Sequence, residues 1–148
     1  MKILQLFVVY SILFYKAQSR CMFNRVTFYV VNKLSQSSPP IDLHCASGDR
    51  ELGYHNIGVG QNFSYSFCTK FRALYFCHLW WRQKDVAFEV WNHNWHSSAC
   101  GFTRDHPKTC YWEARDDGVY LAAQYPPQSF DKLHNWSTHA MPKNQPLV

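Results

Sequence analysis

The stretch IDLHCASGDRELGYH, residues 41–55, changes character twice along its length. Apolar and polar residues alternate over residues 41–45, which is the period-two pattern of a β-strand with one buried face. The following Ser-Gly-Asp-Arg-Glu favours a turn, and Leu52 resumes the apolar pattern. The histidines, the cysteine and the acids also have the composition of a metal-binding or catalytic cluster. We favour a strand, a charged turn closed at Gly53 and a second strand, with Cys45 pointing inward.

Short strand patterns recur along the rest of the chain. Most alternate, and residues 73–81 are apolar on both faces, as in a central strand covered on both sides. Clusters of Gly, Pro, Asp and Ser separate these runs, and helical periodicity is weak. About eight short strands at this spacing predict an all-β fold, an antiparallel sandwich or barrel. The expected strands are residues 25–31, 41–45, 62–67, 73–81, 86–91, 110–115, 119–123 and 129–136.

The N-terminal residues have the pattern of a secretory signal peptide. A positive residue precedes a mostly apolar run over residues 3–15, and small residues follow at Ala17 and Ser19. This run is shorter than the roughly 20 apolar residues that a membrane-spanning helix needs. We therefore expect a secreted, extracellular protein without membrane insertion. The expected organisation is a signal peptide over residues 1–19, one domain over residues 20–136 and a loose C-terminal tail over residues 137–148.

Six cysteines follow the expected cleavage point, and in a secreted chain an even number predicts disulfide bonds. Cys45 and Cys110 both fall on the apolar faces of their strands, so a bond between two sheets is expected. Cys77 on the central strand is then expected to bond to Cys100 and so to tether the long connection after residue 91. The resulting pairs are Cys45–Cys110, Cys77–Cys100 and Cys21–Cys68.

Two sequons, at Asn62 and Asn135, fit the same compartment and are expected glycosylation sites. They make the protein a candidate glycoprotein.

Metal binding and catalysis are weighed against these structural roles. The histidines of residues 93–106 lack the paired spacing of a zinc site, and neither C-x-x-C nor H-E-x-x-H occurs. The acids fall mostly in turns or on polar strand faces, and no G-x-S-x-G motif is present. The formal net charge of +5 is not gathered into a Lys/Arg cluster. We expect no enzyme activity, no metal or other cofactor and no nucleic-acid partner.

The longest connection, residues 92–108, is the strongest candidate for a partner-binding segment because loops of this length are usually functional or disordered. We expect it to act with the turn at residues 82–85, at one end of the fold, as the surface that binds a partner. The expected contact residues are Arg82, Lys84, Trp95, His96, Phe102 and Arg104.

Several motifs together resemble one known family, the plant self-incompatibility S-proteins or S-protein homologues. The family pattern combines HC-x-S, an acidic LG-x-H, an aromatic F-x-[WY]-x-F, LF-x-C-x-F-x-W, and C-x-W before a DG turn. The corresponding stretches are VNKL (31–34), LHCASGDRELGYHNIGVGQNFSYSF (43–67), LYFCHLWW (74–81), FEVW (88–91), YWEARDDGVYL (111–121) and FDKLHNW (130–136).

The resemblance implies a small secreted β-sandwich cross-linked through four cysteines, whose positions here are Cys45, Cys77, Cys100 and Cys110. It also implies an extracellular ligand, since the founding members are stigma-side determinants that act through a pollen receptor. The family brings no catalytic residues or cofactor.

The sequence departs from the family pattern in three ways. The segment between Cys100 and Cys110 is enlarged, Tyr65 stands where Trp is commoner, and Cys21 and Cys68 are additional to the family's four. We expect a monomeric extracellular ligand or signalling protein with a cell-surface receptor or another extracellular protein as partner. Self-incompatibility-type cell recognition is one candidate role and does not follow from the resemblance alone. The alternative is a secreted carbohydrate-binding module, because tryptophan-rich sandwiches stack sugars.

Overall fold

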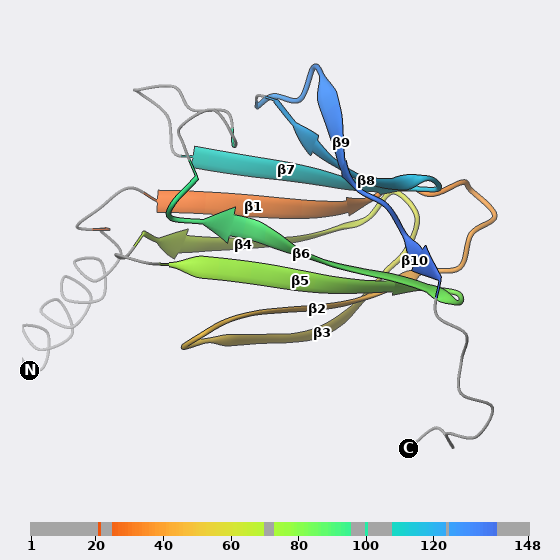
Figure 1. Ribbon diagram of the computed structural model, residues 1–148, viewed down its shortest axis with the longest axis horizontal. Coiled ribbons are helices and arrows are strands. Elements are labelled where there is room, and N and C mark those ends of the chain that lie inside the picture. Colours follow the sequence, from red (N-terminus) through yellow and green to blue (C-terminus); the bar gives the residue numbers. More distant parts are fainter. Residues whose placement is uncertain are drawn as a thin grey trace, which may run out of the picture.

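Two five-stranded sheets form the protein, as described by a computed structural model over residues 21, 25–69, 73–95, 100, 108–123 and 125–138. One sheet, called here the β7 sheet, has the order β4-β1-β7-β8-β9, and the other, the β5 sheet, has the order β10-β6-β5-β2-β3. The two lie face to face (Figure 1). The strands are β1 (Arg25–Asn32), β2 (Ile41–Ser47), β3 (Glu51–Ile57), β4 (Asn62–Cys68), β5 (Leu74–Trp81), β6 (Lys84–Asn92), β7 (Lys108–Arg115), β8 (Gly118–Ala122), β9 (Phe130–His134) and β10 (Ser137–Thr138).

The expected all-β sandwich is confirmed, and each of the eight expected strands has a counterpart among the ten observed. All pairs are antiparallel except β1 and β7, which run parallel with Phe28 opposite Cys110. β3 is the second strand expected after the charged turn, and β10 is additional. β10 occupies the first two positions of the expected C-terminal tail and pairs with β6. No helix in the described ranges is long and apolar enough to cross a bilayer.

The turn between β2 and β3 is shorter than expected. β3 begins at Glu51, so the reversal is confined to residues 48–50, and Gly53 lies inside the strand instead of closing the turn. His44 is opposite Tyr54, whereas Ala46 is opposite Glu51, so β3 carries one extra residue at this point. Gly53 has a φ of 82°, which only glycine adopts freely, and it makes a β-bulge.

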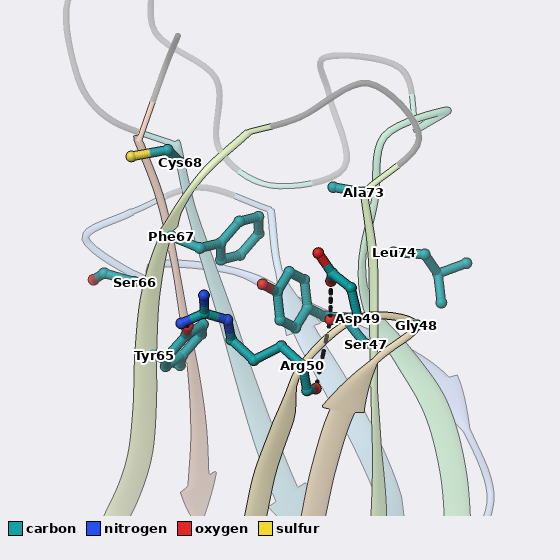
Figure 2. A pocket seen from close by; sticks show the side chains of 11 residues that line it. Ser47, Gly48, Asp49, Arg50, Tyr65, Ser66, Phe67, Cys68, Ala73 and Leu74 are labelled. Atoms are coloured by element: carbon teal, nitrogen blue, oxygen red, sulfur yellow. Dashed lines mark hydrogen bonds between the residues drawn. The ribbon is translucent and has the colours of Figure 1, made fainter. Parts of the chain in front are cut away.

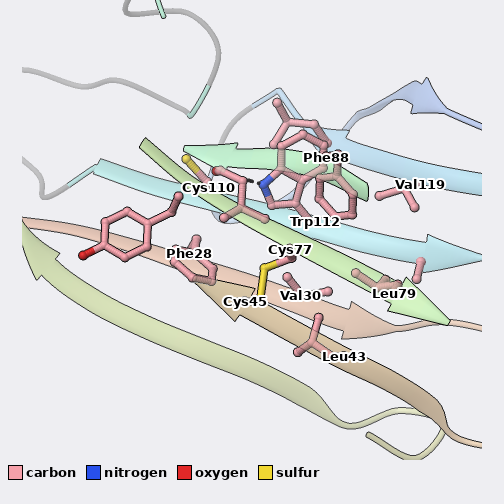
Figure 3. Packing of buried hydrophobic residues seen from close by; sticks show 14 of the residues in the cluster. Phe28, Val30, Leu43, Cys45, Cys77, Leu79, Phe88, Cys110, Trp112 and Val119 are labelled. Carbon is pink, nitrogen blue, oxygen red and sulfur yellow. Dashed lines mark hydrogen bonds between the residues drawn. A yellow bond between two sulfur atoms is a disulfide. The ribbon is translucent and has the colours of Figure 1, made fainter. Parts of the chain in front are cut away.

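The core lies between the two sheets and is dominated by large side chains from their central strands (Figure 3). Trp112 on β7 is fully buried, and its Nε1 donates a hydrogen bond to the carbonyl oxygen of Val90 on β6 at 3.2 Å. The ring of Phe88 packs against Trp112 at 4.8 Å. Trp112 therefore joins the sheets by both packing and a hydrogen bond.

Asn32, at the end of β1, is a fully buried polar residue. Its Nδ2 donates to the carbonyl oxygen of Ile57 at 2.9 Å, and its Oδ1 accepts from the amide of Leu34 at 3.0 Å. Its backbone amide and carbonyl bond to Gln61 and Gly60. A single asparagine thus connects β1 to the end of β3 and to the β3–β4 turn, which explains the polar position in the apolar VNKL stretch.

The disulfide pairing corrects two of the three expected bonds. Cys45 bonds to Cys77, Cys100 bonds to Cys110, and only the Cys21–Cys68 pair is as expected. The Cys45–Cys110 and Cys77–Cys100 bonds are therefore wrong. Cys45 and Cys77 are directly opposite on the neighbouring strands β2 and β5, with Cα atoms 4.1 Å apart (Figure 3). Both point inward, as expected, but β2 and β5 share one sheet, so the bond is within a sheet and not between sheets.

Candidate functional site

A pocket of about 690 Å³ opens at the end of the sandwich where β2 turns into β3. Its walls are the β2–β3 turn, the last residues of β4 and the first residues of β5 (Figure 2). Its volume is within the range of small-ligand sites and also suits side chains of a protein partner. The side chains that define it are Ser47 from the end of β2, Asp49 and Arg50 from the turn, Tyr65 and Phe67 from β4, and Tyr75 from β5.

The rim of the pocket is polar. Arg50 Nη1 donates a hydrogen bond to Tyr65 Oη at 3.2 Å, and this bond raises the pKa of the Arg50 guanidinium above its ordinary value. On the same turn, Ser47 Oγ donates to Asp49 Oδ1 at 2.9 Å. The turn itself is closed by the amide of Ser47, which donates to the carbonyl oxygen of Arg50 at 2.8 Å. The rim therefore presents a cation, a carboxylate and hydroxyl groups on a hydrogen-bonded turn.

The floor of the pocket is aromatic. Phe67 and Tyr75 are buried, with ring centroids 4.2 Å apart, and Phe28 from β1 packs behind both. Burial raises the pKa of the Tyr75 phenol above its ordinary value, so this hydroxyl stays protonated at neutral pH. An aromatic floor with a polar rim is the arrangement of a binding pocket for a group that is partly apolar.

The described residues contain no group of three or more His, Cys, Asp and Glu side chains placed to share a metal ion. His44, within the stretch 41–55, contacts Glu51 on the outer face of the β5 sheet instead of joining the pocket. The histidines, the cysteine and the acids of residues 44–55 are therefore divided between a turn, a disulfide and two faces of a sheet, and they do not form one cluster.

The expected contact residues do not come together. Arg82 and Lys84 lie at the β5–β6 hairpin, over the ring of Trp81 at 5.5 and 5.0 Å. Trp95 follows the other end of β6, where it is half-buried beside Trp91 and Trp112. β6 has nine residues, so its ends are roughly 26 Å apart, and the two groups are at opposite ends of the sandwich (Figure 1). The expectation that they share one end is wrong; the other expected contacts, His96, Phe102 and Arg104, lie outside the described residues.

Both sequon asparagines are exposed. Asn62 is the first residue of β4, and Asn135 lies between β9 and β10. Their positions leave glycosylation at either site a prediction.

The sequence pattern missed the pocket because its residues come from three separate segments. Arg50 was assigned to a solvated turn, and Tyr65 and Tyr75 to strands, which is where they are. The signal that was present is the alternation of Tyr65 and Phe67 on one strand face, but the partner strand was not identifiable from the sequence.

Comparison with known proteins places these features in a family. The family described as Plant self-incompatibility protein S1 matches residues 27–136, which includes every strand from β2 to β9. S-protein homolog 24 of Arabidopsis thaliana is 30% identical over 99 residues, 65% of this chain and 61% of the relative. S-protein homolog 2 of the same plant is 31% identical over 96 residues, 64% of this chain and 58% of the relative. The chain thus spans about three fifths of the length of these Arabidopsis relatives.

Self-incompatibility protein S1 of Papaver rhoeas is 23% identical over 142 residues, covering 94% of this chain and 93% of that protein. A solved structure of an SPH protein, described as belonging to a widespread family of small, highly stable, secreted plant proteins, has a TM-score of 0.53. It is 17% identical and covers 80% of this chain and all of that chain, so it supports the fold. Secretion, expected from the N-terminal sequence, agrees with this description of the family. The chain belongs to the plant self-incompatibility protein S1 family, whose members include the S-protein homologues.

Proposed function

We propose that the protein is a secreted plant ligand that binds a cell-surface protein and carries out no catalysis. The observation that carries this proposal is the family match over residues 27–136. A role in extracellular signalling in plants follows from the family, whereas the partner and any part in self-incompatibility belong to the proposal. The poppy protein supports a part in self-incompatibility because its alignment covers nearly the whole length of both chains.

The structural roles of the signature residues favour binding over catalysis. Asn32 and Trp112 are buried and hold the sheets together. Arg115 donates through two nitrogens to one oxygen of the buried Glu113, and its carbonyl accepts from Trp136 Nε1 at 2.8 Å. These groups satisfy one another inside the fold, so the signature specifies the scaffold, and exposed positions outside it are left to choose the partner.

We assign the partner contact to the pocket end of the sandwich. Protein interfaces combine a desolvated aromatic centre with a polar rim, and arginine and tyrosine are enriched among the residues that contribute most affinity. The pocket has this composition, with Phe67 and Tyr75 at the floor and Arg50 and Tyr65 at the rim. The Cys21–Cys68 disulfide lies at its margin and fixes the end of β4. Trp95 is at the same end of β6 as the pocket, so one part of the expected contact set fits this assignment.

Labelled protein binding to intact plant cells tests the proposal. Arg50→Ala removes the exposed cation and its hydrogen bond to Tyr65, so we expect at least tenfold weaker saturable binding. The matched control is Arg82→Ala with Lys84→Ala, which removes two cations at the opposite end and is expected to bind like wild type. Protease treatment of the cells is expected to abolish the signal, because the partner is a protein.

Two outcomes overturn parts of the proposal separately. If the control variant loses binding and Arg50→Ala keeps it, the contact surface is the hairpin end. If no saturable, protease-sensitive binding is found on any tissue, the protein is not a ligand of this kind. Restriction of expression to the pistil, together with arrest of pollen growth by the purified protein, would extend the proposal to self-incompatibility; broad expression would reject that extension.

A further inference from the structure

The outer face of the β5 sheet carries a continuous row of aromatic and imidazole rings on its β3, β2 and β5 strands. Tyr54 stacks on His44 with centroids 4.4 Å apart, and lies 6.3 Å from Trp80 at an interplanar angle of 25°. Trp80 stacks on His78 at 3.9 Å. Phe76 meets His44 edge-on at 6.5 Å. These five residues are called the ring row.

The ring row follows from strand alternation and register. The residues Cys45, Cys77 and Leu79 point into the core, so their sequence neighbours on β2 and β5 point outward. His44 is directly opposite both Tyr54 and His78 in the two ladders. Because the alternate residues of β2 and β5 are buried against the β7 sheet, the row faces away from that sheet. The core packing therefore does not require these rings.

Two rings of the row are exposed to an extent that is unusual for their size. Tyr54 is 76% exposed and Phe76 is 37% exposed, whereas His44, His78 and Trp80 are half-buried. Scattered exposed aromatic residues are ordinary, but exposed rings joined through half-buried rings on one face of a sheet mark a binding surface.

Hydrogen-bonding groups border the rings. His44 Nε2 is 2.7 Å from Glu51 Oε1, and His78 Nε2 is 2.7 Å from Asp85 Oδ2. Beside Trp80, Asp42 accepts a hydrogen bond from Asn56 Nδ2 at 2.7 Å. The surface thus alternates apolar ring faces with carboxylate, amide and imidazole groups whose orientations are fixed by mutual hydrogen bonds.

This combination fits a sugar better than a protein surface. A pyranose presents C–H groups on its faces and hydroxyls around its edge. The C–H groups pack against the electron-rich faces of aromatic rings, and the hydroxyls bond to carboxylates and amides. The centre of a protein interface is depleted of charge because a charged group is costly to desolvate there. Carboxylates such as Glu51 and Asp85 instead keep hydrogen-bond donors when sugar hydroxyls replace water.

The carboxylates on the outer face of the β5 sheet distinguish between charged and uncharged sugars. The outward positions of β2, β3, β5 and β6 include Asp42, Glu51, Asp85 and Glu89, and no lysine or arginine lies among the outward residues that the structure describes there. Like charges repel, so a polyuronate is disfavoured and an uncharged glycan is favoured. We propose that the ring row is a binding platform for neutral oligosaccharides, separate from the pocket assigned to the protein partner.

Titration calorimetry with cello- and xylo-oligosaccharides as neutral probes and oligogalacturonate as the acidic probe tests the platform. Wild-type protein is expected to bind at least one neutral probe and to bind the acidic probe at least tenfold more weakly. Tyr54→Ala is expected to weaken neutral binding at least tenfold, and Trp80→Ala to do the same. The matched control is Tyr125→Ala, which removes a 48% exposed tyrosine in the β8–β9 connection, stacked on Tyr29 of the other sheet, and is expected to leave binding unchanged.

Folding is monitored by thermal unfolding of each variant, and Tyr54→Ala is expected to unfold like wild type because its side chain is largely exposed. Absence of binding to every neutral probe overturns the proposal, as does equal binding by Tyr54→Ala and wild type. Loss of cell binding by Tyr54→Ala that persists after enzymatic removal of the wall polysaccharides would also overturn it, because the row would then contact a protein. The Arg50→Ala variant is expected to bind the glycan normally, so the two proposals can fail independently.

Discussion

At the scale of single residues, the family signature is explained by burial and hydrogen bonding. Asn32 is polar and fully buried, yet both ends of its side-chain amide are bonded to backbone groups of other segments. The sequence alone marked this position only as part of a motif. Its role depends on Ile57, which lies 25 positions away in the chain and which sequence patterns do not place beside it.

Replacing Asn32 by alanine is expected to lower the free energy of unfolding by about 2 kcal/mol or more, because it leaves a buried carbonyl and a buried amide without partners. Urea unfolding measures the change. Asn56→Ala is the matched control, since Asn56 makes a single hydrogen bond at the surface and its loss is expected to cost well under about 1 kcal/mol. Equal losses for the two variants would contradict the anchoring role of Asn32.

A second residue-scale prediction concerns His134, whose imidazole packs on Phe88 at 5.2 Å. Burial lowers the pKa of His134 below its ordinary value of 6.5. As the pH falls through 6.5 toward the lower pKa of the folded state, the unfolded chain binds a proton first, so folding stability decreases. Unfolding measured at pH 7.5 and pH 5 is expected to show a smaller loss on acidification in His134→Phe than in wild type. An equal or larger loss in the variant would contradict this assignment.

At the scale of elements, strand existence was predictable and strand pairing was not. Alternation identified most of the expected strands, because one buried face leaves a clear period of two. Residues 73–81 were expected to be covered on both faces, but the burial of β5 alternates and Phe76 on its outer face is 37% exposed. The strand after the charged turn was expected, but its start was placed too late because Glu51 and Gly53 have the composition of a turn, and a β-bulge admits a glycine within a strand. β2 and β5 are neighbours because β3 lies at the edge of their sheet and β4 lies in the other sheet. Local sequence patterns do not show this arrangement, so they could not predict the Cys45–Cys77 bond.

The disulfides differ in the loops that they close. Under the chain-entropy relation, the Cys45–Cys77 bond, with a sequence separation of 32, contributes about 3.7 kcal/mol, and the Cys100–Cys110 bond, with a separation of 10, contributes about 2.8 kcal/mol. Alanine replacement of both cysteines in the first pair is expected to cost more stability than in the second, as measured by denaturant unfolding. Non-reducing peptide mapping that linked Cys45 to Cys110 would contradict the pairing.

The β7–β8 turn supplies another element-scale prediction. A Cβ atom on Gly118 would stand within 2.4 Å of the carbonyl oxygen of His134 on β9, whereas one on Gly48 would meet nothing within 4 Å. Gly118→Ala is therefore expected to destabilise the protein by at least about 2 kcal/mol, since backbone must move to accept it. Gly48→Ala is the control and is expected to change the midpoint of thermal unfolding little. Similar midpoints for both variants would show that β9 is not held against β8 as described.

At the scale of the whole molecule, the sandwich separates its surfaces. The pocket lies at one end, the β5–β6 hairpin lies at the other, and the ring row covers an outer face. The sequence placed the contact residues on the longest loop and a charged turn because each is conspicuous locally. The pocket instead combines a turn and two strands from different sheets, and only the folded arrangement brings Arg50, Tyr65 and Tyr75 together.

The central claim is that this scaffold presents its pocket end to a protein on the cell surface. The most direct test is the dissociation constant of the labelled protein on protoplasts, from which wall polysaccharides have been removed, for wild type, Arg50→Ala and Tyr54→Ala. The account predicts saturable, protease-sensitive binding that weakens at least tenfold in Arg50→Ala and is unchanged in Tyr54→Ala. Wild-type affinity in Arg50→Ala would contradict it.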